Sequence, residues 1–187
     1  MKIIFLTGPK HCGKTATGRE LATLLSCGFT DLDDLIFWET GRTPRQLYEQ
    51  SPEIFKKAEA EALANFLKNE CGKTEEEAAK KNNSGGENKI TQIMATGGGI
   101  IDNSRTVPLL KNTETVIIYL NVSAETAWNR IAGEGELPPF LKTENPKESH
   151  RLLHERRGSA YQEIADIVIN SEGKTPRVIA QEIYSRL

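Results

Sequence analysis

The stretch GPKHCGKT at residues 8–15 constrains the fold more than any other feature of the chain. It matches the pattern G-x-x-x-x-G-K-[ST] in full, and it follows KIIFL, a run of β-branched and apolar residues at 2–6. Apolar residues then recur at helical spacing over residues 14–26. A strand, a glycine loop and a helix in this order predict the opening unit of an α/β domain, with phosphate groups held at the loop.

The loop supplies a set of candidate contacts for a nucleoside triphosphate. Its glycines let successive N–H groups point at phosphate oxygens, and the helix N-terminus adds partial positive charge. Lys14 can reach the β- and γ-phosphates, and the Thr15 hydroxyl can ligate Mg²⁺. Cys12 is expected to serve mainly as a small filler. The nucleotide-binding candidates from the loop are Gly8, Lys10, His11, Cys12, Gly13, Lys14 and Thr15.

Strand and helix signals alternate along the rest of the chain. The pair Ser51-Pro52 is expected to break the second helical region, and Thr175 and Pro176 are expected to start the last helix. Alternation of this kind indicates one three-layer α/β domain over residues 1–187, with a five-stranded parallel sheet flanked by helices. The expected later strands are 28–36 (short, running into a turn), 90–102 (ending in glycines), 115–122 and 167–174 (a strand and turn), and the expected later helices are 44–67, 123–133, 150–166 and 175–187.

Two segments differ from this pattern. Residues 68–89 are almost wholly polar, with five Lys balanced by five Glu, which predicts a solvated insertion made of an extended helix end and a mobile tip. A partner-binding site is the alternative interpretation of that segment. Residues 133–149 are rich in Gly, Pro and polar residues, which predicts a mobile loop of the lid type.

Composition limits the possible partners. The 187 residues carry a formal net charge of −2 and a sequence pI of about 6.0, which argues against a bulk electrostatic grip on nucleic acid or on an anionic membrane. The three cysteines show no CxxC spacing, so neither a zinc site nor a disulfide framework is expected. The chain shows no signal-peptide pattern and no apolar run of ~20 residues. These features predict a cytoplasmic protein.

Two acidic residues follow the expected second strand, in FTDLD. Strand alternation would put Asp31 and Asp33 on the same side, facing the phosphate site, with Asp34 pointing elsewhere. One carboxylate could then lie near a metal ion, while the other accepts a proton from a hydroxyl group. The alternative is an acidic turn with capping roles. The glycines of TGGG could bring backbone N–H groups close to a ligand, or could simply make a tight turn.

Together with the loop, five stretches resemble the shikimate kinase family: FTDLDDLI, the helix around IFKKAEAEAL, TGGG, GELPPFL and ERRGSAYQEIAD. The resemblance covers nearly the whole chain apart from residues 68–89. It implies a P-loop kinase fold in which helices at about 34–67 bind the substrate. It also implies transfer of the γ-phosphate of ATP, with Mg²⁺, to the 3-hydroxyl of shikimate, usually by a monomer.

The resemblance also implies roles for individual residues. Asp31 would support Mg²⁺ through water, and Asp33 would bind the substrate hydroxyls and act as the base. The three glycines Gly97, Gly98 and Gly99 would lie against the substrate, with Gly98 as the direct contact. Arg157, or its neighbour Arg156, would grip the substrate carboxylate in a two-pronged way.

The same comparison implies an adenine site and shows two departures. Arg130 would pack on one face of the adenine, with Lys174 and Pro176 near the other. Lys56 stands where the family usually has a second carboxylate-binding Arg, and a lysine lacks the planar fork. Pro138 stands where the lid usually carries an Arg that stabilises charge during transfer, with Lys142 and Lys10 as candidate substitutes.

Three interpretations therefore stay open at the level of sequence. The first is a divergent shikimate kinase, and the second is a kinase of the same build that acts on another small hydroxylated acceptor. The third is a nucleotide-binding regulatory protein with little catalysis. A protein without catalysis has no need of all six expected site residues, so their joint retention argues against the third interpretation; they are Lys14, Thr15, Asp31, Asp33, Gly98 and Arg157.

Overall fold

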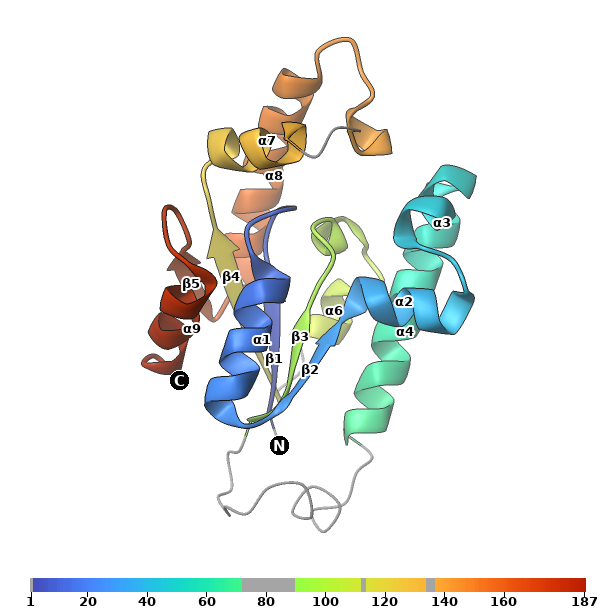
Figure 1. Cartoon of the computed structure of the whole chain (residues 1–187). Coiled ribbons are helices and arrows are strands. Elements are labelled where there is room, and N and C mark those ends of the chain that lie inside the picture. The colour runs from blue at the N-terminus through green and yellow to red at the C-terminus, as the bar shows by residue number, and fades with distance from the viewer. Residues whose placement is uncertain (1, 72–89, 112–113, 134–136) are drawn as a thin grey trace.

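A computed structural model describes residues 2–71, 90–111, 114–133 and 137–187 (Figure 1). Within these ranges, no helix combines the length and the apolar character needed to cross a membrane. The strands are β1 (Lys2–Thr7), β2 (Gly28–Asp31), β3 (Ile90–Ala95), β4 (Thr115–Asn121) and β5 (Ile167–Asn170). The helices are α1 (Lys14–Leu25), α2 (Leu32–Thr40), α3 (Pro44–Gln50), α4 (Pro52–Cys71), α6 (Val107–Leu110), α7 (Ala124–Ala132), α8 (Pro146–Ile164) and α9 (Pro176–Tyr184), with short 3₁₀ turns η1 (Ile100–Asp102) and η2 (Pro139–Leu141).

The five strands form one parallel sheet in the order β2-β3-β1-β4-β5. The first strand lies at the centre, where Phe5 is level with Met94 of β3 and Ile117 of β4. Parallel strands need helical crossovers, which cover both faces of the sheet, so the central strand is buried throughout its apolar run. The expected three-layer fold with a five-stranded parallel sheet is confirmed.

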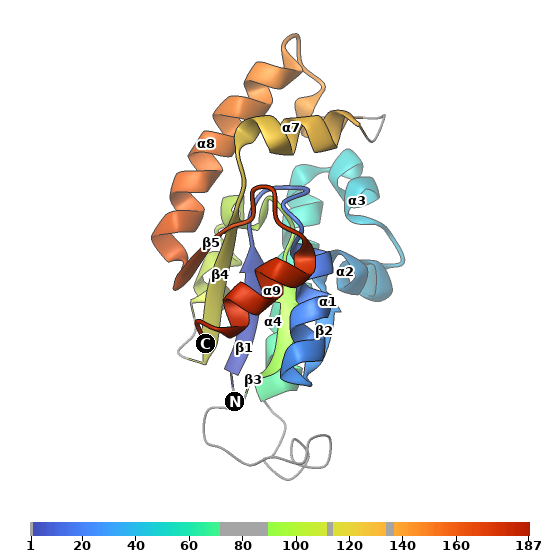
Figure 2. The ribbon, with the colours of Figure 1, turned by 60° about the vertical axis from the view of Figure 1, so that its left-hand side comes forward.

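Alternation along the strands divides the core into two clusters. One cluster takes Phe5, Met94 and Tyr119 from the sheet and packs them against α2, α3, α4, α6 and α8. The other takes Leu6 and Ile118 and packs them against α1, α7 and α9. Successive side chains of a strand point to opposite faces, so a single apolar run supplies both layers. Figure 2 shows α1 and α9 together on one side of the sheet and α4 on the other.

The carboxyl ends of the strands meet beneath a ring of loops and helix ends. The phosphate loop follows β1, the start of α2 follows β2, and the glycine turn follows β3. In Figure 1, α3, α7 and the first turns of α8 stand beyond this edge of the sheet. Ligands of open parallel sheets bind at the carboxyl edge, so this arrangement places any site between the loops and those helices.

Several expected boundaries are corrected by the structure. Residues 32–36, expected to continue a strand into a turn, form the start of α2 because Asp31 caps that helix. The last four residues of the segment expected as a loop at 133–149 belong to α8, which begins at Pro146 with Asn145 as its cap. The break at Ser51-Pro52 is confirmed. Residues 68–71 continue α4, and the rest of the polar insertion lies outside the described residues.

Candidate active site

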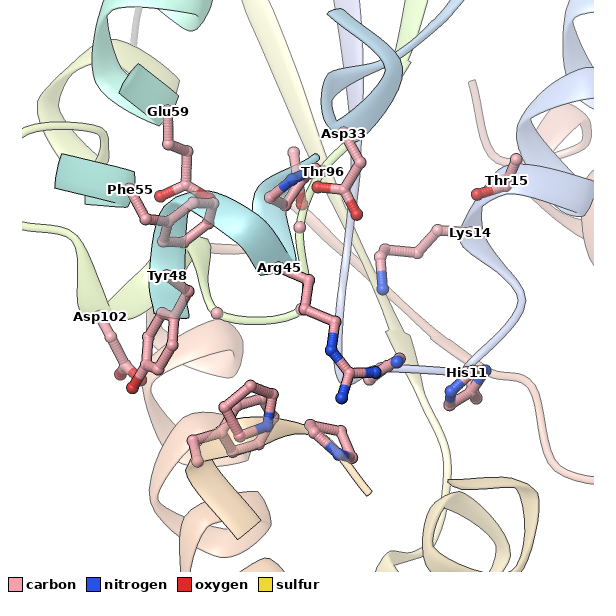
Figure 3. Close-up of a pocket in the computed structure, with 18 of the residues that line it drawn as sticks. His11, Lys14, Thr15, Asp33, Arg45, Tyr48, Phe55, Glu59, Thr96 and Asp102 are labelled. Carbon is pink, nitrogen blue, oxygen red and sulfur yellow. The ribbon is translucent and has the colours of Figure 1, made fainter. Parts of the chain in front are cut away.

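A cavity of about 1110 Å³ opens at the carboxyl edge of the sheet. Figure 3 shows Lys14 and Thr15 on one side of it and Glu59, Tyr48 and Asp102 on the other. Among the residues expected from the sequence to form the site, those that line the cavity are Lys10, His11, Gly13, Lys14, Thr15, Asp31, Asp33, Lys56, Gly97, Gly98, Gly99, Arg130 and Arg157. Segments far apart in the chain therefore converge on one space, as the sequence predicts.

The phosphate loop owes its shape to glycine. Gly8 has φ 139°, a conformation that side chains disfavour, and a Cβ there would lie 2.6 Å from the carbonyl oxygen of Leu120. The loop then turns into α1 at Gly13, which has φ 99°. Backbone N–H groups at the start of α1 are left without helical partners, so they are available to an anion in the cavity.

Lys14 is buried within this loop. Its ammonium donates hydrogen bonds to the carbonyl oxygens of Gly8 at 3.0 Å and of Pro9 at 2.8 Å. Its third close contact is the sulfur of Cys12, at 3.7 Å. Cys12 itself is packed in the core, in keeping with its expected role as a filler. The loop therefore holds the charge of Lys14 at a fixed place beside the cavity before any phosphate arrives.

Thr15, Asp31 and Asp33 form a chain of hydrogen bonds beside the phosphate loop. The Thr15 hydroxyl donates to Asp31 Oδ2 at 2.6 Å, and the Asp33 backbone N–H donates to Asp31 Oδ1 at 3.0 Å. The two aspartates do face one site, but the expected reason was wrong. Asp31 ends a strand and Asp33 lies in the first turn of α2, so a helix cap rather than strand alternation sets their positions. The hydroxyl and carboxylate oxygens that meet here are the ligand types that Mg²⁺ prefers.

The Asp33 carboxyl faces the cavity from the start of α2. Burial among the surrounding atoms raises its pKa, and the negative charge of Asp31 adds to the rise, while Lys14 acts in the opposite direction. A carboxylate with a raised pKa is a better proton acceptor near neutral pH than an ordinary one. Asp33 is therefore the candidate for a general base.

Glu59 is a second carboxyl group in the same wall, and the sequence analysis missed it. Its side chain is 1% exposed, and Oε2 accepts a hydrogen bond from Asn103 Nδ2 at 2.9 Å. A Cβ at Gly97 would lie 3.1 Å from Glu59 Oε1 and 3.4 Å from Asp33 Oδ1, so the two carboxyl groups flank that glycine. Burial above all raises the pKa of Glu59 to about 7.

A signal for Glu59 was present in the sequence. The buried positions of α4 include Ala62, Leu63 and Phe66, which share one face of the helix with residue 59. A glutamate on such an apolar stripe breaks the pattern expected of a helix that packs on a sheet. Misfits of this kind are expected at functional sites, so the position could have been marked as a candidate.

Arg157 of α8 forms the far end of the cavity. Its Nε donates to Asp102 Oδ2 at 2.8 Å, and NH1 donates to the carbonyl oxygen of Gly98 at 3.0 Å. Arg156 bonds both oxygens of the same aspartate, at 2.8 and 3.0 Å. Burial would raise the pKa of Asp102, but the two arginines outweigh it and lower that pKa. Asp102 was not expected from the sequence, but it fixes the guanidinium of Arg157, which was expected.

Aromatic rings cover this end of the cavity. Tyr48 of α3 meets Phe55 of α4 and Phe140 of η2 edge to face, with ring centroids 6.0 and 6.4 Å apart. The guanidinium of Arg157 lies over the Phe140 ring at 5.5 Å. Lys56 lines the same region from α4. The acceptor end thus combines apolar walls with cations, which suits a small ring that carries a carboxylate.

The expected adenine contacts fall into two groups. Arg130 of α7 lines the cavity, and its NH1 donates to the carbonyl oxygen of His11 at 2.6 Å. Lys174 and Pro176 lie outside the described lining of the cavity, and the Lys174 ammonium is paired with Glu182 at 2.6 Å. A role for these two residues beside the base stays a prediction. Gly8 and Cys12 shape the loop from behind the cavity wall.

The segment at 137–145 passes over the acceptor end. Pro138, Pro139 and Phe140 line the cavity, so the residue that stands in place of the expected arginine does face the site. Lys142 is exposed and is not part of the lining, whereas Lys10 is. The described part of this segment therefore covers the cavity without adding a cation to it.

A phosphate loop and a separate acceptor pocket that open into one cavity are typical of kinases that phosphorylate small molecules. This is the class that the fold and the site define. The chain belongs to the shikimate kinase family: the family model described as shikimate kinase matches residues 10–74 and 73–187. Members of this family are ATP-dependent phosphotransferases with an alcohol group as acceptor.

Individual relatives agree with this assignment over nearly the whole chain. A shikimate kinase of Vibrio parahaemolyticus is 30% identical over 185 residues, which are 98% of this chain and 95% of the relative. One of Shewanella oneidensis is 27% identical with the same coverage. Among solved structures, a shikimate kinase of Acinetobacter baumannii in complex with shikimate has a TM-score of 0.81 and 28% identity, covering 100% of this chain and 92% of that one.

Proposed function

We propose that this chain transfers the γ-phosphate of ATP to the 3-hydroxyl of shikimate. The main observation is that one cavity holds Lys14 and Thr15 at one end and Asp102, the partner of Arg157, at the other, with Asp33 between them. A nucleotide and a hydroxylated carboxylate bound at these ends would meet at Asp33. The relative solved with shikimate, at 28% identity, supports the choice of acceptor.

At the nucleotide end, the loop binds the phosphates through backbone N–H groups and the Lys14 ammonium. Lys14 exchanges its bonds to the carbonyls of Gly8 and Pro9 for bonds to phosphate oxygens. Thr15 and Asp31 are the residues that would hold Mg²⁺, which supplies further positive charge to the phosphates when bound. Arg130 orients the loop through the carbonyl of His11.

At the acceptor end, Arg157 binds the carboxylate of shikimate and Asp33 binds the attacking hydroxyl. Asp102 and the carbonyl of Gly98 hold the guanidinium in place, so the carboxylate meets a fixed partner. Asp33 accepts the hydroxyl proton as the new phosphorus–oxygen bond forms. Lys56 adds a second cation to the carboxylate without the two-pronged geometry of an arginine.

The segment at 137–145 acts as the lid over these groups. Phe140 already contacts the aromatic ring of Tyr48 on α3, so closing the segment further would bring apolar surface down onto the acceptor. Exclusion of water matters here because water is a competing acceptor for the phosphoryl group. The enzyme acts as a monomer in this proposal.

The test is a coupled assay of ADP release with shikimate as the acceptor. Purified protein with ATP and Mg²⁺ is compared with and without shikimate, and the phosphorylated product is identified by mass. We expect ADP release to depend on shikimate and to yield one phosphorylated product per ADP. Release of ADP that does not respond to shikimate at any concentration would rule out this acceptor.

A second acceptor is favoured by one feature of the site. Lys56 replaces an arginine at the carboxylate end, so the site offers one guanidinium and one ammonium to the anion. Another small hydroxylated carboxylate could suit this pair better than shikimate. The same assay with a panel of polyols and hydroxy acids separates the two, because the true acceptor gives the highest kcat/KM.

A further inference from the structure

The phosphoryl group in transfer carries negative charge, and kinases lower the barrier by placing cations around it. In this chain the segment over the cavity presents Pro138, Pro139 and Phe140, none of which carries a charge. A group that neutralises the phosphoryl group from the side opposite the loop must therefore come from another wall of the cavity. This step rests on the function proposed above.

Most of the cations that line the cavity lie toward one of its two ends. Lys14 is bonded to the loop carbonyls, Arg130 to the carbonyl of His11, and Arg157 to Asp102. Lys10 belongs to the loop itself, and Lys56 lies at the carboxylate end. The lysines and arginines in the described lining are Lys10, Lys14, Arg45, Lys56, Arg130 and Arg157. Arg45 is thus the member of this set that comes from α3.

Arg45 lies between the two ends of the site. Figure 3 shows its side chain leaving α3 and entering the cavity, with the guanidinium directed toward the side on which Lys14 and His11 lie. Its Nε donates to Glu49 Oε1 at 3.1 Å, and the two side chains are 41% and 48% exposed. An ion pair this exposed contributes little to stability.

The position of Arg45 in its helix adds an independent argument. Arg45 stands in the first turn of α3, where the backbone N–H groups carry partial positive charge and a cation is disfavoured. The N-terminus is already satisfied by a capping box of Thr43 and Gln46, and the first turn holds no acidic residue. A positive charge at this position is unfavourable to the helix dipole, whereas it would be favourable to a bound triphosphate.

We propose that Arg45 is a catalytic residue whose guanidinium contacts the phosphoryl group in transfer and neutralises its developing charge from the α3 side. Its planar fork can donate to two phosphate oxygens at once, which suits this task better than the ammonium of Lys10. Arg45 forms no covalent bond. The bond between the γ-phosphorus and the ADP oxygen breaks, the bond to the acceptor oxygen forms, and Asp33 takes the hydroxyl proton.

Kinetics of matched variants test this proposal. Arg45→Ala is expected to lower kcat about 100-fold with the KM of the acceptor nearly unchanged, and Arg45→Lys to lose less. Arg42→Ala is the control, because Arg42 lies three residues earlier, bonds Gln50 at 2.7 Å and is not part of the described lining. Glu49→Gln removes the ion pair but keeps the cation, so it should retain turnover. If Arg45 served only that pair, Glu49→Gln and Arg45→Ala would behave alike.

A binding measurement tests the same contact without turnover. Aluminium fluoride with ADP and Mg²⁺ mimics the phosphoryl group in transfer, and calorimetry compares its binding with that of ADP and Mg²⁺ alone. Arg45→Ala should bind the aluminium fluoride complex about 100-fold more weakly than the wild type and should bind ADP equally well. Equal affinities of the two proteins for the aluminium fluoride complex would overturn the role of Arg45. Failure of shikimate to accept phosphate would instead overturn the acceptor proposed above.

Discussion

The nucleotide end of the cavity is made mainly by one continuous loop at residues 8–15, which Asp31 and Arg130 contact, whereas the acceptor end draws on α2, α4, the glycine turn and α8. In the loop, backbone carbonyls hold the one buried cation, Lys14. At the acceptor end, side chains hold side chains: Arg157 is bonded to Asp102, and Glu59 is bonded to Asn103. One end is therefore specified locally and the other by tertiary contacts.

This difference shows where the chain can vary without losing its class. A loop whose geometry comes from glycines and backbone groups keeps its function only if its own few residues are kept. A network of side chains can exchange one partner for another. The nucleotide end accordingly defines a kinase, while the acceptor end decides what the kinase phosphorylates.

The largest effect is expected from removing the loop cation. Lys14→Met should lower the rate of transfer by on the order of 10³-fold or more, because no other group takes its place within the loop. The measurement is the coupled ADP assay at saturating substrates. Lys142→Met is the control, since Lys142 is exposed and lies outside the described lining. Turnover of Lys14→Met close to that of the wild type would refute the assignment of the nucleotide end.

The next largest effect is expected at Asp33, which lies between the nucleotide end and the acceptor end of the cavity. Asp33→Asn should lower kcat by about 10²- to 10⁴-fold while the KM for ATP changes little, because the amide cannot accept the hydroxyl proton. Asp34→Asn is the matched control: it is the next residue in α2 and is not part of the described lining. A loss shared equally by both variants would point to damage to the helix rather than to removal of a base.

The same contrast explains what the sequence could and could not predict. The order of the strand and helix signals and their periodicity were sufficient to predict the sheet, and the GKT loop was sufficient to predict the nucleotide end. Both depend on residues that are neighbours in the chain. Asp31 and Asp33 were found through strand alternation, whereas the helix cap that sets their positions was considered only as the alternative to a shared site. Asp102 was missed because its importance comes from its contact with the distant Arg157, and Arg45 because only the fold brings α3 to the cavity.

A smaller effect is expected in stability from the buried carboxyl group of the acceptor end. The pKa of Glu59 is raised to about 7 from an ordinary value of 4.5, so the folded protein keeps a proton that the unfolded chain releases. Its stabilising contribution is full below pH 4.5 and is lost as the pH rises to about 7. The difference between these two values corresponds to on the order of 3 kcal/mol.

Glu59→Gln should remove this dependence, because the amide resembles the protonated acid and cannot ionise. The measurement is urea unfolding of both proteins at pH 5 and pH 8, in which the variant should gain stability relative to the wild type at the higher pH. Glu61→Gln on the same helix is the control, since that side chain is exposed and paired with Lys57 at 3.7 Å. An unchanged difference between wild type and Glu59→Gln at the two pH values would contradict the proposed buried acid.

The smallest effect is expected from Asp102, whose side chain positions the guanidinium of Arg157. Asp102→Asn should raise the KM for the acceptor about tenfold and leave kcat nearly unchanged, because Arg157 loses the charged partner that fixes its direction. Arg156→Ala, which removes the outer partner of the same aspartate, should change KM less. A lower KM in Asp102→Asn would show the opposite relation, in which the aspartate competes with the acceptor carboxylate for Arg157. The size of the change in KM measures how strongly acceptor binding depends on the contact between Asp102 and Arg157.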